Sequence, residues 1–233
     1  YITGGAQAMA DAMAKKICSE GGQLKLDSSV EKILTSGDRA IGVQLNNGEK
    51  LFSDIVISNA DVGHTYSNLL KEKRKKRWTK RYLNKKNWSM SLFVWHFGTK
   101  KTSQMWKHVD HHTILVGPNY KKEVEDIFIK GNLPDEMSLY IHRPSVTDDS
   151  VAPKGDDTFY VLACVPHLGF SNSIDWEVNK EIYKNKVLSM LEKKLMPGLG
   201  KKIKTEYVMT PIDFQNRYLS TYGSGFSIEP RMF

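Results

Sequence analysis

Two short apolar runs near the middle of the chain constrain its fold more than any other feature. They span residues 138–141 and 159–165 and contain aromatic and aliphatic side chains typical of strands. The connection between them is polar and rich in Asp, Pro and Gly, which favour turns and loops. The pattern therefore predicts a strand, a loop and a second strand in this region.

Two longer segments show helical spacing instead. Residues 6–20 carry an apolar face, and Gly21-Gly22 follows it as expected at the C-terminal end of a helix. Residues 178–195 form the second such segment, and Pro197 and Gly198 after it prevent the helix from continuing. The side chains expected in the core from this second helix are Ile182, Val187, Met190 and Leu191.

Shorter elements fill the rest of the chain. Asn46-Asn47-Gly48 predicts a hairpin turn, since Asn and Gly accept positive φ angles. The remaining expected strands are 23–26, 30–35, 40–45, 51–52, 54–58, 90–97 and 203–209, and the remaining expected helices are 62–70 and 121–130. This mixture predicts a combined α/β and α+β fold.

Length and cysteine content narrow the class of protein. A chain of 233 residues can form one large domain or parts of two, and its first residue, Tyr1, leads directly into a Gly-Gly turn and a helix. We interpret it as an internal piece of a longer protein. Cys18 and Cys164 lie far apart and lack CxxC spacing, so we expect neither a disulfide framework nor a cysteine-based zinc site. A reducing, cytoplasmic setting follows.

The positive charge of the chain is concentrated in one segment. Residues Lys71–Lys86 hold ten Lys or Arg residues and one Glu, a local charge of +9 against +8 for the whole chain. Trp78 and Tyr82 lie within this run, which makes it a candidate for contact with an anionic membrane surface. A solvated linker or helix face explains it equally well. No nucleic-acid recognition motif accompanies it, so no nucleic-acid partner is expected.

Several multi-residue segments occur in an order that identifies a family. They include SMSLFVWHFG at 89–98, HHTILVGPNY at 111–120, FYVLACVPHLG at 159–169 and GSGFSIEP at 223–230. In these segments the chain resembles the bacterial-type phytoene desaturases, which are flavin-dependent carotenoid desaturases. The resemblance extends along nearly the whole chain.

The resemblance implies a domain organisation. Residues 1–70 would be the central part of a FAD-binding, Rossmann-type domain, 71–87 a basic connector, and 88–233 a mixed-sheet substrate-binding domain. FAD would be the cofactor, and the parent protein would desaturate phytoene towards neurosporene or lycopene. Its partners would be an apolar carotene and the cytoplasmic face of a membrane, to which it would bind peripherally. The resemblance leaves the oligomeric state open.

Flavin-binding signals are sparse within the 233 residues. No GxGxxG follows a strand, and Gly223-Ser-Gly225 lacks the apolar helix that a phosphate loop requires. The resemblance implies that the flavin-binding ends and the catalytic residues lie outside the chain. Within it, the backbone of Val30 is expected to face the adenine of FAD, or else to be an ordinary strand residue.

Four further residues are candidates for contact with the cofactor or substrate. Asn59 and Ala60 follow an expected strand, and ligands gather at the carboxyl ends of strands in such sheets. Gly4 and Gly5 permit a close approach of the backbone to the flavin or the substrate. A turn at the start of a helix explains the two glycines equally well.

The histidines and aromatic strands leave two questions open. His108, His111 and His112 cluster around Asp110, but HExxH spacing is absent, and we expect a surface or packed cluster without metal. His142 and His167, in the family-like strands, are expected either to line a pocket or, more often for such residues, to form supporting hydrogen bonds. The apolar strands suit either a long tunnel for a C40 polyene or an ordinary sheet core.

Two alternative functions remain at this stage. The first is desaturation of a C30 or an oxygenated carotene by a related flavoenzyme. The second belongs to another class, a basic membrane- or nucleic-acid-binding module without redox activity. Bound flavin in the full-length protein distinguishes the enzyme from the module. The isolated fragment is expected to be inactive and to bind FAD poorly.

Overall fold

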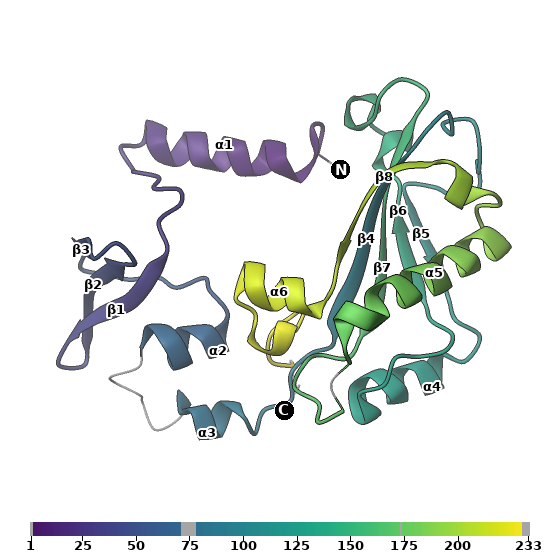
Figure 1. Ribbon diagram of the computed structural model, residues 1–233. Helices are drawn as coiled ribbons and strands as arrows, with labels where there is room; N and C mark the ends of the chain where they lie inside the picture. The colour runs from purple at the N-terminus through teal and green to yellow at the C-terminus, as the bar shows by residue number, and fades with distance from the viewer. Residues whose placement is uncertain (1, 71–77, 173, 230–233) are drawn as a thin grey trace.

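The computed structural model describes residues 2–70, 78–172 and 174–229. Within these ranges the strands form two sheets, joined and covered by helices (Figure 1). The smaller sheet has the order β1 (Val30–Ser36), β2 (Arg39–Leu45), β3 (Lys50–Phe52). The larger sheet has the order β5 (His112–Leu115), β6 (Leu139–His142), β7 (Asp157–Val165), β4 (Ser91–Thr99), β8 (Ile203–Met209). Neighbouring strands in both described sheets are antiparallel.

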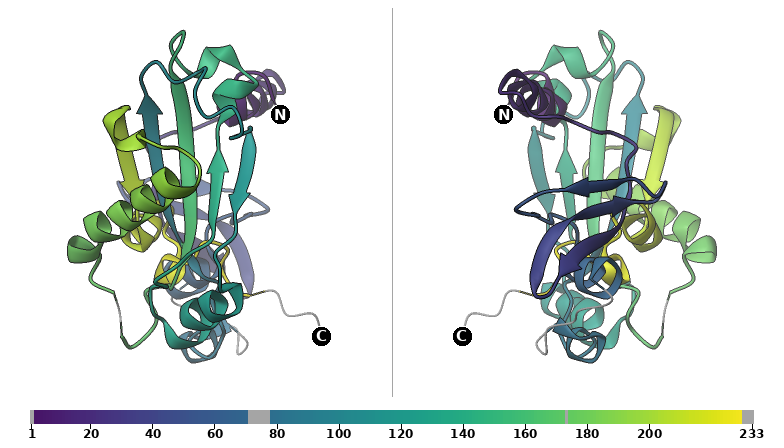
Figure 2. Two further views of the ribbon diagram at one scale, coloured as in Figure 1. Left: turned by 90° about the vertical axis from the view of Figure 1, so that its right-hand side faces the viewer. Right: turned by 90° about the vertical axis from the view of Figure 1, so that its left-hand side faces the viewer.

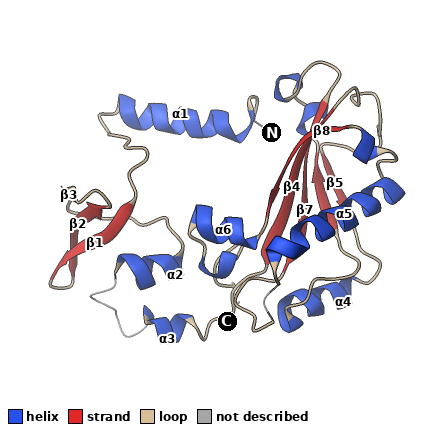
Figure 3. Ribbon diagram, in the orientation of Figure 1, coloured by secondary structure: helices blue, strands red, loops and turns tan. Residues whose placement is uncertain are grey.

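The helices differ greatly in length (Figure 3). Two are long, α1 (Gly5–Ser19) and α5 (Trp176–Lys194). Two short helices each continue into a π-helical turn, α2 (Val62–His64) into Thr65–Leu69 and α4 (Tyr120–Glu125) into Asp126–Lys130. The others are α3 (Lys80–Leu83) and α6 (Pro211–Tyr218). The predicted combination of helices and sheets is confirmed, and the larger sheet is antiparallel throughout its described strands.

The main core lies between α5 and one face of the larger sheet. Alternate residues of β7 point towards α5, so Phe159 and Val161 are buried while their neighbours are only half-buried. From α5, Val187 and Leu191 are fully buried against them. Two predicted core positions of this helix are thus confirmed, and Met190 packs partly buried against the same core, but Ile182 is 52% exposed. The adjacent Tyr183 takes the buried position instead, because the buried face of α5 is rotated towards it.

The first part of the chain has little buried apolar surface of its own. The structure leaves no side chain of α1 buried, and Met9, Met13 and Ile17 are each about half exposed. The predicted hairpin turn is confirmed between β2 and β3, where Gly48 has a φ of 87°. Figure 2 shows that α5 and the smaller sheet lie on opposite sides of the larger sheet.

Some predicted elements are absent. Residues 23–26 and 54–58 do not form strands in the structure, and Ile55 and Ile57 are 77% and 87% exposed. A strand needs a hydrogen-bonded neighbour, and no described segment pairs with either stretch. Conversely, the structure contains strand β5 and helix α6, which the sequence did not predict.

Polar contacts connect the segment at the start of α2 with the segment that follows α6. The Asp61 carboxylate accepts hydrogen bonds from the hydroxyl groups of Thr221 and Ser227, the second at 2.9 Å. It also caps α2 by accepting from the His64 backbone N–H at 3.0 Å. Among the described helices, none has both the length and the apolar character needed to cross a bilayer.

Candidate functional site

A ladder of polar aromatic rings lies on the face of the larger sheet opposite α5. Because strand side chains alternate, this face receives His96 from β4, Tyr160 from β7, Tyr140 and His142 from β6, and His112 from β5. Successive rings are in contact across the strands. The centroid distances are 5.5 Å for His96–Tyr160, 5.5 Å for Tyr160–Tyr140, 5.9 Å for Tyr140–His112 and 5.2 Å for His112–His142.

The ladder is electrically neutral at its centre near pH 7. Burial lowers the pKa of His142 below its usual 6.5, and the nearby His111 and His112 lower it further. Burial also raises the pKa of Tyr140 and of Tyr160 above 10, so both hydroxyl groups keep their protons. The surface therefore suits contact with a molecule that has no charged groups.

An apolar patch continues the ladder towards α6. Leu92, Val94 and Met209 are buried on this side of the sheet, and Phe214 of α6 packs against them. The two faces of the sheet thus differ: one forms the main core with α5, and the other presents aromatic and apolar groups towards the side that holds α1 and the smaller sheet (Figure 1). The sheet core is thus found on the face that packs against α5, and the apolar tunnel stays a prediction for the opposite face.

The sequence-predicted flavin contacts lie apart from one another. Val30 begins β1, an edge strand, so one edge of its backbone has no strand partner among the described residues. Ala60 lines a hollow of about 330 Å³ together with Ile33 of β1, whereas Asn59 is exposed outside that lining. Val30 does not line this hollow, and its adenine-facing role stays a prediction.

Gly4 and Gly5 occupy the start of α1, far along the chain from the other predicted contacts. Both have positive φ angles, 85° and 75°. The Gly4 N–H donates to the Asp148 carboxylate at 3.1 Å. This contact ties the start of α1 to the connection between β6 and β7. No described hydrogen bond joins either glycine to Val30 or Asn59, so their expected approach to flavin or substrate stays a prediction.

Only part of the basic run falls within the described residues, since 71–77 lie outside them. Trp78 stacks on Tyr66 at 5.1 Å and meets Tyr82 edge-on at 5.8 Å. The Lys86 ammonium lies 4.3 Å from the centroid of the Tyr82 ring. Within the described part of the run, Trp78 thus packs against the π-helical turn that follows α2.

The histidines that lie together in the structure differ from those that are adjacent in the sequence. His111 and His112 approach His142, while the Nε2 atom of His108 contacts the carbonyl oxygen of Leu195 at 2.7 Å. His167 forms a separate stack with Phe170, at 4.6 Å between centroids. Sequence reasoning missed the pairing of His112 with His142 because it depends on the register of β5 against β6.

The sequence profile of the flavin containing amine oxidoreductases matches residues 1–214. The chain belongs to this family. Membership of this family implies a flavin cofactor. The family assignment agrees with the resemblance found in the strand sequences.

Several curated relatives of the chain are phytoene desaturases. The chain is 57% identical over all 233 residues to the neurosporene-forming phytoene desaturase of Rhodobacter capsulatus and 52% identical to that of Cereibacter sphaeroides. A lycopene-forming phytoene desaturase from a Paracoccus species is 43% identical. The chain spans 44%, 45% and 45% of the lengths of these relatives, and 100%, 100% and 99% of the chain is matched.

A solved oxidoreductase structure from Methanosarcina mazei shares the fold. Its TM-score is 0.62 at 18% sequence identity, and the match covers 88% of this chain and 42% of that one. The likeness supports the arrangement of helices and sheets described above.

Proposed function

We propose that this chain is part of an FAD-dependent phytoene desaturase that forms neurosporene. The observation that carries the proposal is the 57% identity, over the entire chain, to a neurosporene-forming phytoene desaturase. The ring ladder supports it, because a neutral aromatic and apolar face suits a carotene without charged groups. Residues 1–70, 71–87 and 88–233 keep the domain roles predicted for them.

FAD, when bound, supplies the oxidising equivalents for removing hydrogen from adjacent carbons. In this chain the edge of β1 at Val30 would face the adenine, and Asn59 and Ala60 would lie near the cofactor. The backbone at Gly4 and Gly5 would approach the flavin or the substrate. The ring ladder would orient the carotene by contact area, because the substrate has no polar group for a side chain to bind.

Expression of the complete gene in a phytoene-producing bacterium tests the proposal. We expect neurosporene as the main carotenoid, measured by chromatography of extracted pigments, and a flavin absorption spectrum in the purified protein. Lycopene as the main product would overturn the product assignment. Unchanged phytoene, with desaturation of a C30 carotene instead, would favour the first alternative function, and a folded, colourless protein would favour the module without redox activity.

Tyr160→Glu provides the structural arm of this test. A carboxylate at the centre of the ladder would have to be desolvated by the carotene, so we expect at least ~10-fold less neurosporene per unit of folded flavoprotein. Tyr120→Glu is the matched control, because Tyr120 is 61% exposed at the start of α4 and lies outside the ladder. Equal pigment yields from the two variants would exclude the ladder as a substrate surface.

We also propose that the basic run Lys71–Lys86 holds the protein peripherally on the cytoplasmic face of the membrane, where an apolar carotene resides. Changing Lys80, Arg81 and Lys85 to Gln is expected to weaken binding of the full-length protein to anionic vesicles by about 100-fold, at roughly 1 kcal/mol per charge. Vesicle co-sedimentation measures this. The control changes Lys193, Lys194 and Lys201, which are exposed lysines outside the basic run, to Gln. An equal loss of vesicle binding in the control would mean that the basic run is a solvated segment without a specific role in membrane binding.

A further inference from the structure

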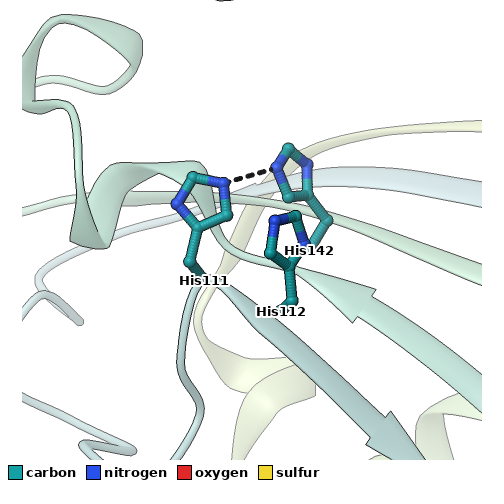
Figure 4. A group of neighbouring side chains, drawn as sticks. All are labelled: His111, His112 and His142. Atoms are coloured by element: carbon teal, nitrogen blue, oxygen red, sulfur yellow. Dashed lines mark hydrogen bonds between the residues drawn. The ribbon is translucent and has the colours of Figure 1, made fainter. Parts of the chain in front are cut away.

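Three histidines converge at one end of the β5–β6 strand pair (Figure 4). His112 and His142 are directly opposite each other in the antiparallel register. His111 precedes β5, and its carbonyl oxygen accepts a hydrogen bond from the Arg143 N–H at 2.9 Å, which places it beside the end of β6. The Nε2 atoms of His111 and His142 are 2.9 Å apart. One nitrogen from each of the three rings lies within 4.8 Å of the others.

Two of these rings each contact a hydroxyl group through Nδ1. Nδ1 of His111 lies 2.6 Å from the Thr147 hydroxyl, and Nδ1 of His112 lies 2.7 Å from the Tyr140 hydroxyl. Metal-binding histidines commonly use one ring nitrogen for the metal and the other for a hydrogen bond that fixes the ring orientation. Both rings have such a partner at Nδ1. Nε2 of His111 contacts Nε2 of His142, and a shared ligand would replace this contact.

We propose that His111, His112 and His142 bind one zinc ion. Imidazole nitrogens favour Zn²⁺ over Mg²⁺ and Ca²⁺, which prefer oxygen ligands. With zinc–nitrogen bonds of about 2.0–2.1 Å and tetrahedral angles, two ligand nitrogens are separated by about 3.3 Å. The 2.9 Å separation of His111 and His142 therefore has to widen by only about 0.4 Å.

The position of this zinc site indicates what it would do. β5 is the edge strand of the larger sheet, and Thr147 lies on the connection that leads towards β7. A zinc ion would fasten β5 to β6 and to this connection through three ligands and one supporting hydroxyl. The expectation of a cluster without metal rested on His108, His111 and His112, and the structure puts His142 in the place of His108. The zinc site shares His112 and His142 with the ring ladder, so its zinc content is measured separately from carotene desaturation.

Zinc content and affinity of the full-length flavoprotein test the proposal. After removal of metal with a chelator and addition of ZnSO₄, we expect one zinc per chain by elemental analysis. Zinc-edge X-ray absorption should show nitrogen ligands at about 2.0–2.1 Å. Thr147→Val should weaken the affinity by about 10–100-fold, as expected for a supporting hydrogen-bond partner.

Separate changes of His111, His112 and His142 to Gln should each weaken zinc binding by at least ~100-fold. His111→Gln keeps the test decisive if the strand variants do not fold, because His111 precedes β5. His108→Gln is the matched control and should bind zinc like the unchanged protein. The proposal is wrong if the unchanged protein binds no zinc, if His111→Gln retains full affinity, or if the absorption spectrum shows sulfur ligands. In those cases the three rings form only a hydrogen-bonded cluster.

Discussion

Replacing Arg143 with Met is expected to lower the free energy of unfolding by about 3–5 kcal/mol. Arg143 is 2% exposed and forms a two-bond ion pair with Asp157, with Nη2 to Oδ2 at 2.9 Å and Nε to Oδ1 at 3.1 Å. Its guanidinium also donates to the carbonyl oxygens of Trp106 and Val109. The variant leaves a buried carboxylate and several buried carbonyl oxygens with fewer donors, which explains the size of the expected loss.

Chemical denaturation followed by circular dichroism measures this effect, with Arg39→Met as the control. Arg39 pairs with Asp54 at 3.7 Å, but their side chains are 71% and 99% exposed, so its removal should change stability by no more than about 0.5 kcal/mol. The double variant Arg143→Met, Asp157→Leu should recover much of the loss, because it removes the unpaired charge. Equal effects of Arg143→Met and Arg39→Met would contradict the assigned role of the buried pair.

The sequence predicts those elements whose signal is local. The hairpin between β2 and β3 follows from Asn47-Gly48, β1 and β2 follow from their apolar strand-like residues, and α5 follows from its helical spacing. Strand β5 escapes prediction because it has only four residues and two of them, His112 and Ile114, are exposed. Its formation depends on pairing with β6, and no local pattern encodes this pairing.

The candidate sites are less predictable than the fold, because they depend on register. Tyr140, His142 and Tyr160 look like ordinary strand residues until β6 and β7 are aligned, after which they form one ladder. The Arg143–Asp157 pair is similarly hidden, since the sequence shows only an Arg at the end of one strand and an Asp at the start of another. Burial of both charges is a property of the assembled sheet.

Gly223→Ala is expected to lower the free energy of unfolding by about 2–5 kcal/mol. Gly223 has a φ of 62°, and a Cβ atom there would lie 2.2 Å from the carbonyl oxygen of Pro211 and 2.9 Å from its carbonyl carbon. Backbone atoms at the start of α6 cannot move aside as a flexible side chain does. The Gly223 carbonyl oxygen also accepts a hydrogen bond from the Ser91 hydroxyl, which holds this turn against β4.

Gly155→Ala separates the strain of a positive φ from this clash. Gly155 has a φ of 86°, but a Cβ atom there would have no neighbour within 4 Å. Its substitution should therefore cost only the left-handed backbone strain, about 1 kcal/mol. Denaturation of both variants measures the difference, and equal losses would mean that the backbone of α6 yields. A larger loss for Gly223→Ala would explain the glycine in the Gly223-Ser-Gly225 segment by close packing of α6 on the turn, with no phosphate-binding role required.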